Sequence, residues 1–279
     1  MQSPKEKYSQ IIDMVDNNLD FGEMLEELDY SKSELLLAIH KLINAKETIP
    51  YHIKFNLTKE YLDNLSFSNL GGKKTIIISD THLSSIYENL EYLERVEEFI
   101  KSNNLKYLLH AGDIGDGMVK HKKEYDSYTK QVSHILDVYS EFDNCHQYLI
   151  GGNHDRRYKD KSMDIIKLLA QKKNIEEVGY YQAYFNLYNK NISFEHNSYM
   201  NNNLIQKDLR ILGHAHNTSF KEDKITIPTL SVDVKGIDSK PGFLIMDSKN
   251  KKGKVEVIFE EYNLQENSIK KVKEKKYII

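Results

Sequence analysis

Apolar residues recur at three- and four-residue spacing between residues 8 and 45, which is the period of helices packed on one face. They fall into three stripes: Ile11, Ile12 and Val15; Met24, Leu25 and Leu28; and Leu35, Leu36, Ile39, Leu42 and Ile43. Ser31 and Glu34 have the spacing of a capping box at the start of the third stripe. The pattern therefore predicts three short helices, within a small, mostly helical N-terminal domain over residues 1–70.

Three helices followed by "TIPYHIKFNL" have the layout of a winged helix-turn-helix. In that interpretation residues 31–45 are the recognition helix, residues 48–57 form the wing, and DNA is a partner of this domain. The bases near this helix are Lys32, His40, Lys41 and Lys46, and they are opposed by Glu34 and Glu47. This is a weak set for phosphate contacts. A plain helical cap on the main domain is the alternative, and both interpretations stay open here.

The texture changes after a small, polar, glycine-containing linker at 66–74. Short apolar runs at 74–80, 105–113 and 145–155 read as buried strands. They alternate with amphipathic helices expected at 84–104, 124–142 and 160–174, which predicts parallel strands with helices on the sheet faces. Beyond about residue 180 the pattern becomes β-rich, with antiparallel pairs. We therefore expect an α/β domain over residues 74–264 and a solvated, charged C-terminal tail over residues 265–279.

Composition bounds the functional class without deciding it. Charged residues make up 29% of the chain, the apolar set 39%, and the net charge is -3, as in an ordinary globular protein without a global basic field. The single cysteine, Cys145, excludes an internal disulfide and fits a reducing compartment. Neither a signal peptide nor a membrane-spanning run is apparent. The expectation is a soluble, cytoplasmic protein with no membrane partner and an open oligomeric state.

The candidate chemistry lies where the strands end. Five strand-like runs terminate in residue types that bind metal ions: Asp80, His82, Asp113, Asn153, His196, His214 and His216. Ligands in open α/β sheets gather at the carboxyl ends of strands, and residues two apart in an extended chain point to the same side. Carboxylates, imidazoles and an amide without thiolates suit Mn, Fe, Zn or Co. Seven ligands suit two such ions rather than one.

These blocks stand in a recognisable order: "DTH" at 80–82, "GD" at 112–113, "GNHD" at 152–155, His196, and "GHAH" at 213–216. Over roughly residues 74–262 this order resembles the calcineurin-like metallophosphoesterase superfamily. The resemblance implies a four-layer α/β/β/α sandwich that hydrolyses a phosphoester. It also implies two divalent metal ions, with manganese favoured, and a metal-bridging hydroxide that attacks phosphorus.

The resemblance assigns a role to each matching residue. Asp80, His82 and His216 would bind the first metal, and Asn153, His196 and His214 the second. Asp113 would bridge the two metals. His154 would protonate the leaving oxygen, and Asp155 would orient His154.

Several neighbouring residues carry weaker expectations. Arg156 and Arg157 follow "GNHD" directly, so each is either a clamp for a substrate phosphate or a surface arginine capping the next helix. His110 is expected to hydrogen-bond near the site rather than bind metal. Asp116, in "GDIGDG", is either a residue that supports the site from behind or a loop residue, and the loop interpretation is preferred.

The substrate stays open among nucleic acid, a nucleotide or small phosphodiester, and a phosphoprotein. A phosphodiesterase is the leading interpretation. The alternatives are a phosphomonoesterase or protein phosphatase, and a DNA-binding regulator whose esterase domain is only a scaffold.

Overall fold

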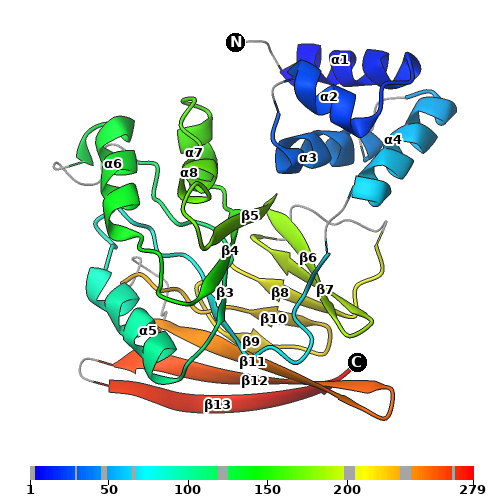
Figure 1. Ribbon diagram of the computed structural model, residues 1–279. Helices are drawn as coiled ribbons and strands as arrows, with labels where there is room; N and C mark the ends of the chain where they lie inside the picture. Colours follow the sequence, from blue (N-terminus) through cyan, green and yellow to red (C-terminus); the bar gives the residue numbers. More distant parts are fainter. Residues whose placement is uncertain are drawn as a thin grey trace. The chain divides into compact units, whose positions relative to one another are not determined.

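A computed structural model of the chain divides it into two compact units, Met1–Ser66 and Phe67–Ile279 (Figure 1). The residues described are 4–28, 30–44, 49–64, 67–118, 125–197, 205–232, 240–265 and 268–279. Among the helices in these ranges, none has the length and apolar character needed to cross a bilayer.

The first unit consists of four helices: α1 (Pro4–Asp16), α2 (Phe21–Leu28), α3 (Lys32–Ile43) and α4 (Tyr51–Asn64). The predicted stripes supply its core, in which Ile11, Met24 and Leu35 are fully buried. The predicted capping box also forms. The Ser31 hydroxyl accepts a hydrogen bond from Glu34 N, and the Glu34 carboxylate accepts one from Ser31 N. The three predicted helices are therefore confirmed.

The predicted wing at 48–57 is wrong over the residues described, because α4 begins at Tyr51. Ile53, Leu57 and Tyr61 are buried at four-residue spacing, so they form the apolar stripe of a fourth helix. Pro50 stands just before α4, where its missing N–H costs nothing, and its carbonyl accepts a hydrogen bond from Lys54 N. The winged motif is thus absent from the described part of this unit.

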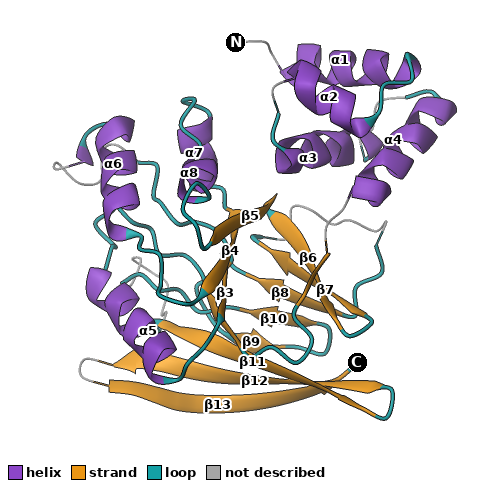
Figure 2. Ribbon diagram, in the orientation of Figure 1, coloured by secondary structure: helices purple, strands orange, loops and turns teal. Residues whose placement is uncertain are grey.

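A seven-stranded sheet carries most of the predicted αβ alternation (Figure 2). Its strands, in spatial order, are β13 (Ser268–Ile278), β12 (Lys254–Gln265), β11 (Gly242–Lys251), β2 (Thr75–Ile78), β3 (Tyr107–His110), β4 (His146–Gly151) and β5 (Ile175–Tyr180). Strands β2 to β5 pair in parallel, as predicted, whereas β11, β12 and β13 join the edge as antiparallel strands.

The β-rich half contributes a second, six-stranded sheet. Its spatial order is β1 (Phe67–Asn69), β6 (Gln182–Leu187), β7 (Lys190–Glu195), β8 (Leu209–Leu212), β10 (Lys224–Thr226) and β9 (Ser219–Phe220). The β6–β7 hairpin is antiparallel, as predicted, but β8 pairs in parallel with both β7 and β10. This sheet begins inside the predicted linker, because Phe67–Asn69 pairs with β6.

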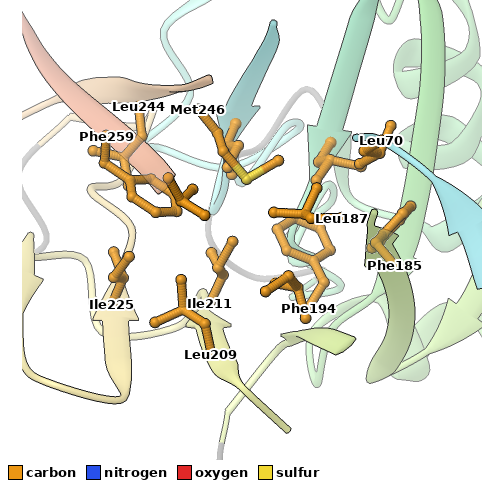
Figure 3. Packing of buried hydrophobic residues seen from close by; sticks show 14 of the residues in the cluster. Leu70, Phe185, Leu187, Phe194, Leu209, Ile211, Ile225, Leu244, Met246 and Phe259 are labelled. Atoms are coloured by element: carbon orange, nitrogen blue, oxygen red, sulfur yellow. The ribbon is translucent and has the colours of Figure 1, made fainter. Parts of the chain in front are cut away.

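The two sheets pack face to face around one apolar core (Figure 3). Leu244, Met246 and Phe259 from the seven-stranded sheet face Phe194 and Ile211 from the six-stranded sheet. Over its described residues this unit has the helices α5 (Leu90–Ser102), α6 (Tyr128–Val138), α7 (Asp155–Lys159) and α8 (Ile165–Leu169). The mixed α/β class with two sheets, preceded by a helical domain, is therefore confirmed.

Several boundaries differ from the sequence-based expectation, and the helices expected over 124–142 and 160–174 are shorter, spanning Tyr128–Val138 and Ile165–Leu169. The helix expected from residue 84 begins at Leu90, and Ile86, placed on its apolar face, is 54% exposed in the preceding loop. The charged tail is a strand: β13 pairs along its length with β12, and its Tyr277 is buried against Phe259. An apolar residue near the end of a lysine-rich segment was the available signal for that strand.

Candidate metal centre and active site

The predicted ligands lie in the turns just beyond the strand ends rather than in extended chain. Five of them have a positive φ: Asp80 (54°), His82 (45°), Asp113 (53°), His214 (68°) and His216 (57°). This left-handed conformation is uncommon for residues other than glycine. The expectation that extended two-residue spacing would aim paired ligands at one point was therefore wrong. Tight turns aim them instead, and strained backbone of this kind clusters at functional sites.

The first group consists of Asp80, His82 and His216. Asp80 Oδ1 lies 3.2 Å from His216 Nε2 and 3.8 Å from His82 Nε2, and the two imidazole nitrogens are 3.3 Å apart. All three side chains are buried. The donor atoms of the three residues thus converge on one point, as metal ligands do.

The second group consists of Asp113, His196 and His214, with Asn153 beside it. His196 Nε2 lies 3.1 Å from Asp113 Oδ2 and 3.2 Å from the Asn153 amide oxygen. Its other ring nitrogen, Nδ1, lies 2.6 Å from the Ala111 carbonyl oxygen, which fixes the ring with Nε2 toward the group.

Backbone hydrogen bonds join the two groups. His214 N donates to Asp80 Oδ2 at 2.9 Å, and His82 N donates to the carbonyl oxygen of Asp113 at 3.1 Å. Glycine at two positions allows the backbone of one turn to lie close to the atoms of the next. A Cβ on Gly152 would lie 2.1 Å from Asp113 Oδ1, and one on Gly213 would lie 2.4 Å from Ser79 Oγ. The seven predicted ligands therefore form two adjoining clusters.

The protonation preferences of the first group fit a cation. Burial lowers the pKa of His82 to about 4, so its ring is neutral and offers a lone pair at neutral pH. Burial raises the pKa of Asp80, but its hydrogen bond to His216 and the charges of His196, His216 and His82 outweigh that effect and hold it well below the usual range. A carboxylate facing two imidazole nitrogens that are 3.3 Å apart matches the donor set of a divalent metal.

In the second group, Asp113 and His196 form a buried ion pair. Burial opposes the charged form of His196, yet Asp113 and Asp80 raise its pKa to about 9. Burial likewise opposes the charged form of Asp113, but His196 lowers its pKa to about 2. A bound cation would release the proton from His196, because a ligating imidazole must be neutral.

His154 stands beside the first group. Its ring centroid lies 4.8 Å from that of His82, edge to face, and its backbone N–H donates to Asp113 Oδ1 at 2.8 Å. Its Nδ1 lies 2.7 Å from the Asp116 carbonyl oxygen and 3.3 Å from Asp116 Oδ1. Burial and Arg157 lower the pKa of His154, but Asp116 and Asp113 raise it more, so the net shift is upward.

The family comparison matches this arrangement. The family described as calcineurin-like phosphoesterase matches residues 73–259 of the chain. The chain belongs to this family. None of the curated proteins gives a significant match to the sequence.

Several solved structures match about three quarters of this chain, all with low sequence identity. Vps29 of Cryptosporidium parvum is 13% identical with a TM-score of 0.45, and covers 74% of this chain and 98% of its own. A Vps29 single mutant of Entamoeba histolytica is 12% identical with a TM-score of 0.43, covering 74% and 99%. The calcineurin-like phosphoesterase YfkN of Bacillus subtilis is 11% identical with a TM-score of 0.34, covering 74% and 90%.

The resemblance implied that Asp155 orients His154. The structure shows a different role for the Asp155 carboxylate. Its carboxylate instead accepts hydrogen bonds from the backbone N–H groups of Ile114, Gly115 and Gly152, at 3.3, 2.9 and 2.7 Å. It thereby fastens the turn after β3 to the turn after β4. Burial, together with the nearby Asp113, raises the pKa of Asp155 to about 7.

The residue that contacts His154 from behind is Asp116, so the less favoured of the two sequence-based interpretations of Asp116 fits the structure. Asp116 is buried and contacts His154 through both its carbonyl and its carboxylate. The spacing in "GDIGDG" was the only signal, since a buried aspartate and a turn aspartate look alike in sequence. His110 behaves as predicted, with Nε2 3.2 Å from Thr81 Oγ1.

Arg156 and Arg157 have different neighbours in the structure. Arg157 Nη1 donates to the Asp116 carbonyl oxygen at 2.9 Å and lies 2.8 Å from His154 Nδ1, so Arg157 belongs to the surroundings of His154. Arg156 Nε instead lies 3.6 Å from Asp160 Oδ1.

Proposed function

We propose that the chain is a two-metal phosphoesterase whose preferred substrates are phosphodiesters. The observation that supports this most directly is the meeting of two ligand groups with His154 at their edge. Asp80, His82 and His216 would hold one divalent cation, and Asn153, His196 and His214 the other. Asp113 would serve both, because its carboxylate contacts His196 and its charge also acts on the buried His82 ring.

Two divalent cations in such a site neutralise phosphoryl oxygens and lower the pKa of water, so that water becomes a nucleophile at neutral pH. The side chains of this protein supply the rest of the reaction. Arg157 places a guanidinium next to His154, where negative charge on the substrate would be stabilised.

His154 would act as the general acid. With Nδ1 bonded to Asp116, its Nε2 is the nitrogen left to face a substrate. The upward pKa shift favours the protonated ring, which can donate its proton to the departing oxygen. No protein nucleophile is required in this scheme.

The direct test is hydrolysis of bis-p-nitrophenyl phosphate and of p-nitrophenyl phosphate with added Mn, by the native chain and by His154→Ala. We expect the diester to be hydrolysed faster. We also expect His154→Ala to lose about 10²- to 10⁴-fold in kcat, the usual contribution of a general acid. Activity on the monoester alone would favour a phosphatase. No activity with any divalent metal would favour the scaffold role.

We also propose manganese as the preferred metal, with Fe, Zn and Co as the other candidates for this nitrogen- and oxygen-rich set. Metal analysis of the purified protein, joined to reconstitution with each ion, tests this choice. A preparation that carries two equivalents of another ion and is most active with it would contradict the manganese assignment.

Nucleic acid remains the proposed macromolecular substrate, and the helical unit the proposed contact. Two of the basic residues proposed for phosphate contact near α3 no longer contribute to this proposal. His40 is buried, and Lys46 lies outside the described residues. Lys32 and Lys41 remain, so α3 should contribute a salt slope of only about −2 in a plot of log K against log salt. Titrating DNA binding of the full chain against Lys32→Gln/Lys41→Gln tests this: an unchanged slope would exclude α3.

A further inference from the structure

The two successive arginines serve different places because neighbouring residues on a helix point about 100° apart. Arg157 turns inward to His154 and the Asp116 carbonyl. Arg156 turns toward Asp160, and its side chain is 47% exposed. A solvent-accessible guanidinium therefore stands one residue from the group that surrounds His154.

Tyr181 is a second neighbour of Arg156. The guanidinium and the Tyr181 hydroxyl are close enough for each group to shift the pKa of the other. Tyr181 also packs edge to face on the buried Tyr180, with ring centroids 5.0 Å apart. These contacts fix the position of the phenol at the point where Arg156 is exposed.

The backbone of Tyr181 ties this pair to the second ligand group. Tyr181 N donates to the Gly151 carbonyl oxygen at 3.1 Å, and its own carbonyl accepts from His196 N at 2.8 Å. Gly151 ends β4 just before Asn153, so Tyr181 connects the two segments that carry Asn153 and His196. Its φ of 70° is strained for a bulky residue, and strain of this kind persists where the surroundings impose it.

The chemistry of the pair suits a phosphoryl oxygen. A guanidinium has five N–H donors, and the contacts with Asp160 and Tyr181 use only part of them. Arginine binds phosphate through two parallel hydrogen bonds, and a phenol can add a third. The carboxylate of Asp160 is 61% exposed, so water screens its competing charge.

We propose that Arg156 and Tyr181 form a subsite for a second phosphoryl group of the substrate, adjacent to the one that is cleaved. This inference rests on the proposed phosphodiesterase function. The reacting phosphate already has the two ligand groups, His154 and Arg157, whereas Arg156 contacts Asp160 and lies next to Tyr181. The substrate class is therefore a nucleotide chain with neighbouring phosphates rather than an isolated diester.

The test compares hydrolysis of thymidylyl-thymidine with that of its 5′- and 3′-phosphorylated forms in the presence of Mn. We expect the native chain to show a kcat/KM at least about tenfold higher for one phosphorylated form, the effect of one well-made charge-assisted contact. Arg156→Gln should bring this ratio close to one.

Variants at Tyr181 separate the roles of its ring and its hydroxyl. Tyr181→Asn tolerates the positive φ and removes both, so the ratio should fall. Tyr181→Phe keeps the ring and should give an intermediate ratio. Lys161→Gln removes an exposed cation from the same segment and is the matched control, which should keep the native ratio.

Two outcomes would overturn the subsite. One is a native chain with no preference for either phosphorylated form. The other is an equal loss on all substrates in Arg156→Gln, which would place Arg156 on the reacting phosphate.

A chain that hydrolyses none of these substrates would contradict the proposed function instead. Equilibrium binding would still decide the subsite in that case. The Mn-loaded native chain should bind thymidine 3′,5′-bisphosphate at least about tenfold more tightly than thymidine 5′-monophosphate, and Arg156→Gln should lose the difference. Equal affinities in the native chain would overturn the subsite.

Discussion

At the scale of single residues, the orientation and the pKa of His154 depend on its neighbours Asp116 and Arg157. Asp116 contacts its Nδ1 with two oxygens, and Arg157 approaches the same atom. The aspartate favours the protonated ring and the arginine opposes it, and the aspartate prevails. The position and the charge of the proposed acid are therefore both set by neighbouring side chains.

Asp116→Asn removes the carboxylate charge but keeps the carbonyl contact. We expect kcat to fall about 10- to 100-fold, as for other residues that orient a working side chain. Because the pKa of His154 loses a cause of its upward shift, the decline of activity at high pH should begin at a lower pH. A pH–rate profile of the variant measures both effects.

The control for this variant is Asp143→Asn, which removes a carboxylate that is 80% exposed and has no role in the proposed site. An Asp116→Asn profile that overlays the native one would remove Asp116 from the support of His154.

Residue spacing was sufficient to pick out the residues that cluster in the structure, but not the residues that support them. Asp80, His82 and the five other predicted ligands stand in an ordered set of short blocks, and such order is visible in one sequence. The role of Asp116 depends on which way its side chain turns after β3. The role of Asp155 depends on N–H groups that sequence does not display.

At the scale of elements, the site needs the turns after β3 and β4 to touch. Gly152 N lies 2.7 Å from Asp155 Oδ2, and a Cβ on Gly152 would lie 2.4 Å from Asp113 N. The end of a flexible side chain could move to relieve so short a contact. The backbone N of Asp113 cannot move in this way.

Gly152→Ala should therefore separate the two turns and move Asp113 away from His196. We expect metal content to fall below one equivalent and activity to be lost. Elemental analysis and hydrolysis of the diester measure these effects. Gly253→Asn is the control, because Gly253 has a positive φ that Asn tolerates and no neighbour within 4 Å of an added Cβ. Full metal content in Gly152→Ala would contradict this view of the turns.

The terminal strand β13 also contributes to the fold. Tyr277 is buried against Phe259, with ring centroids 5.8 Å apart, and its hydroxyl donates to the Lys221 carbonyl oxygen at 2.8 Å. Tyr277→Ala should lower the free energy of unfolding by about 2–4 kcal/mol, since it removes a large buried ring and leaves a carbonyl unpaired.

Urea unfolding followed by circular dichroism measures this loss. Val272→Ala on the same strand is the comparison, because Val272 is 43% exposed and its truncation should cost little. Equal stability of the Tyr277 and Val272 variants would show that the strand is dispensable for the fold.

The elements that sequence misassigned share one physical cause. The segment assigned as a wing has apolar residues that fit either a short strand or one face of a helix, and packing against α3 and α1 decides for α4. The charged tail lacks apolar periodicity because β13 is an edge strand with mostly exposed side chains. Its pairing partner, rather than its own sequence, makes it a strand.

At the scale of the whole molecule, the two ligand groups place several buried ionisable side chains at one end of the sheets. Asp113 and His196 have opposite charges that compensate each other, whereas His82 and His216 face one another with nitrogens 3.3 Å apart. A cation bound only by the folded state should therefore stabilise it.

Adding Mn at 100 times its dissociation constant should raise stability by about 2.7 kcal/mol, and the melting temperature by about 5–10 °C for a domain of this size. Differential scanning calorimetry with EDTA and with Mn measures the shift. His216→Ala should abolish most of it. A melting temperature that does not respond to any divalent ion would contradict a metal centre.

The lysines of β13 have a consequence for the behaviour of the protein at high concentration. Among the described strands, β13 ends the seven-stranded sheet, and it carries Lys270, Lys271, Lys273, Lys275 and Lys276. If the β13 strand of a second copy paired with this edge, the lysine side chains of the two strands would lie close together. Their repulsion disfavours the edge-to-edge aggregation to which exposed edge strands are prone.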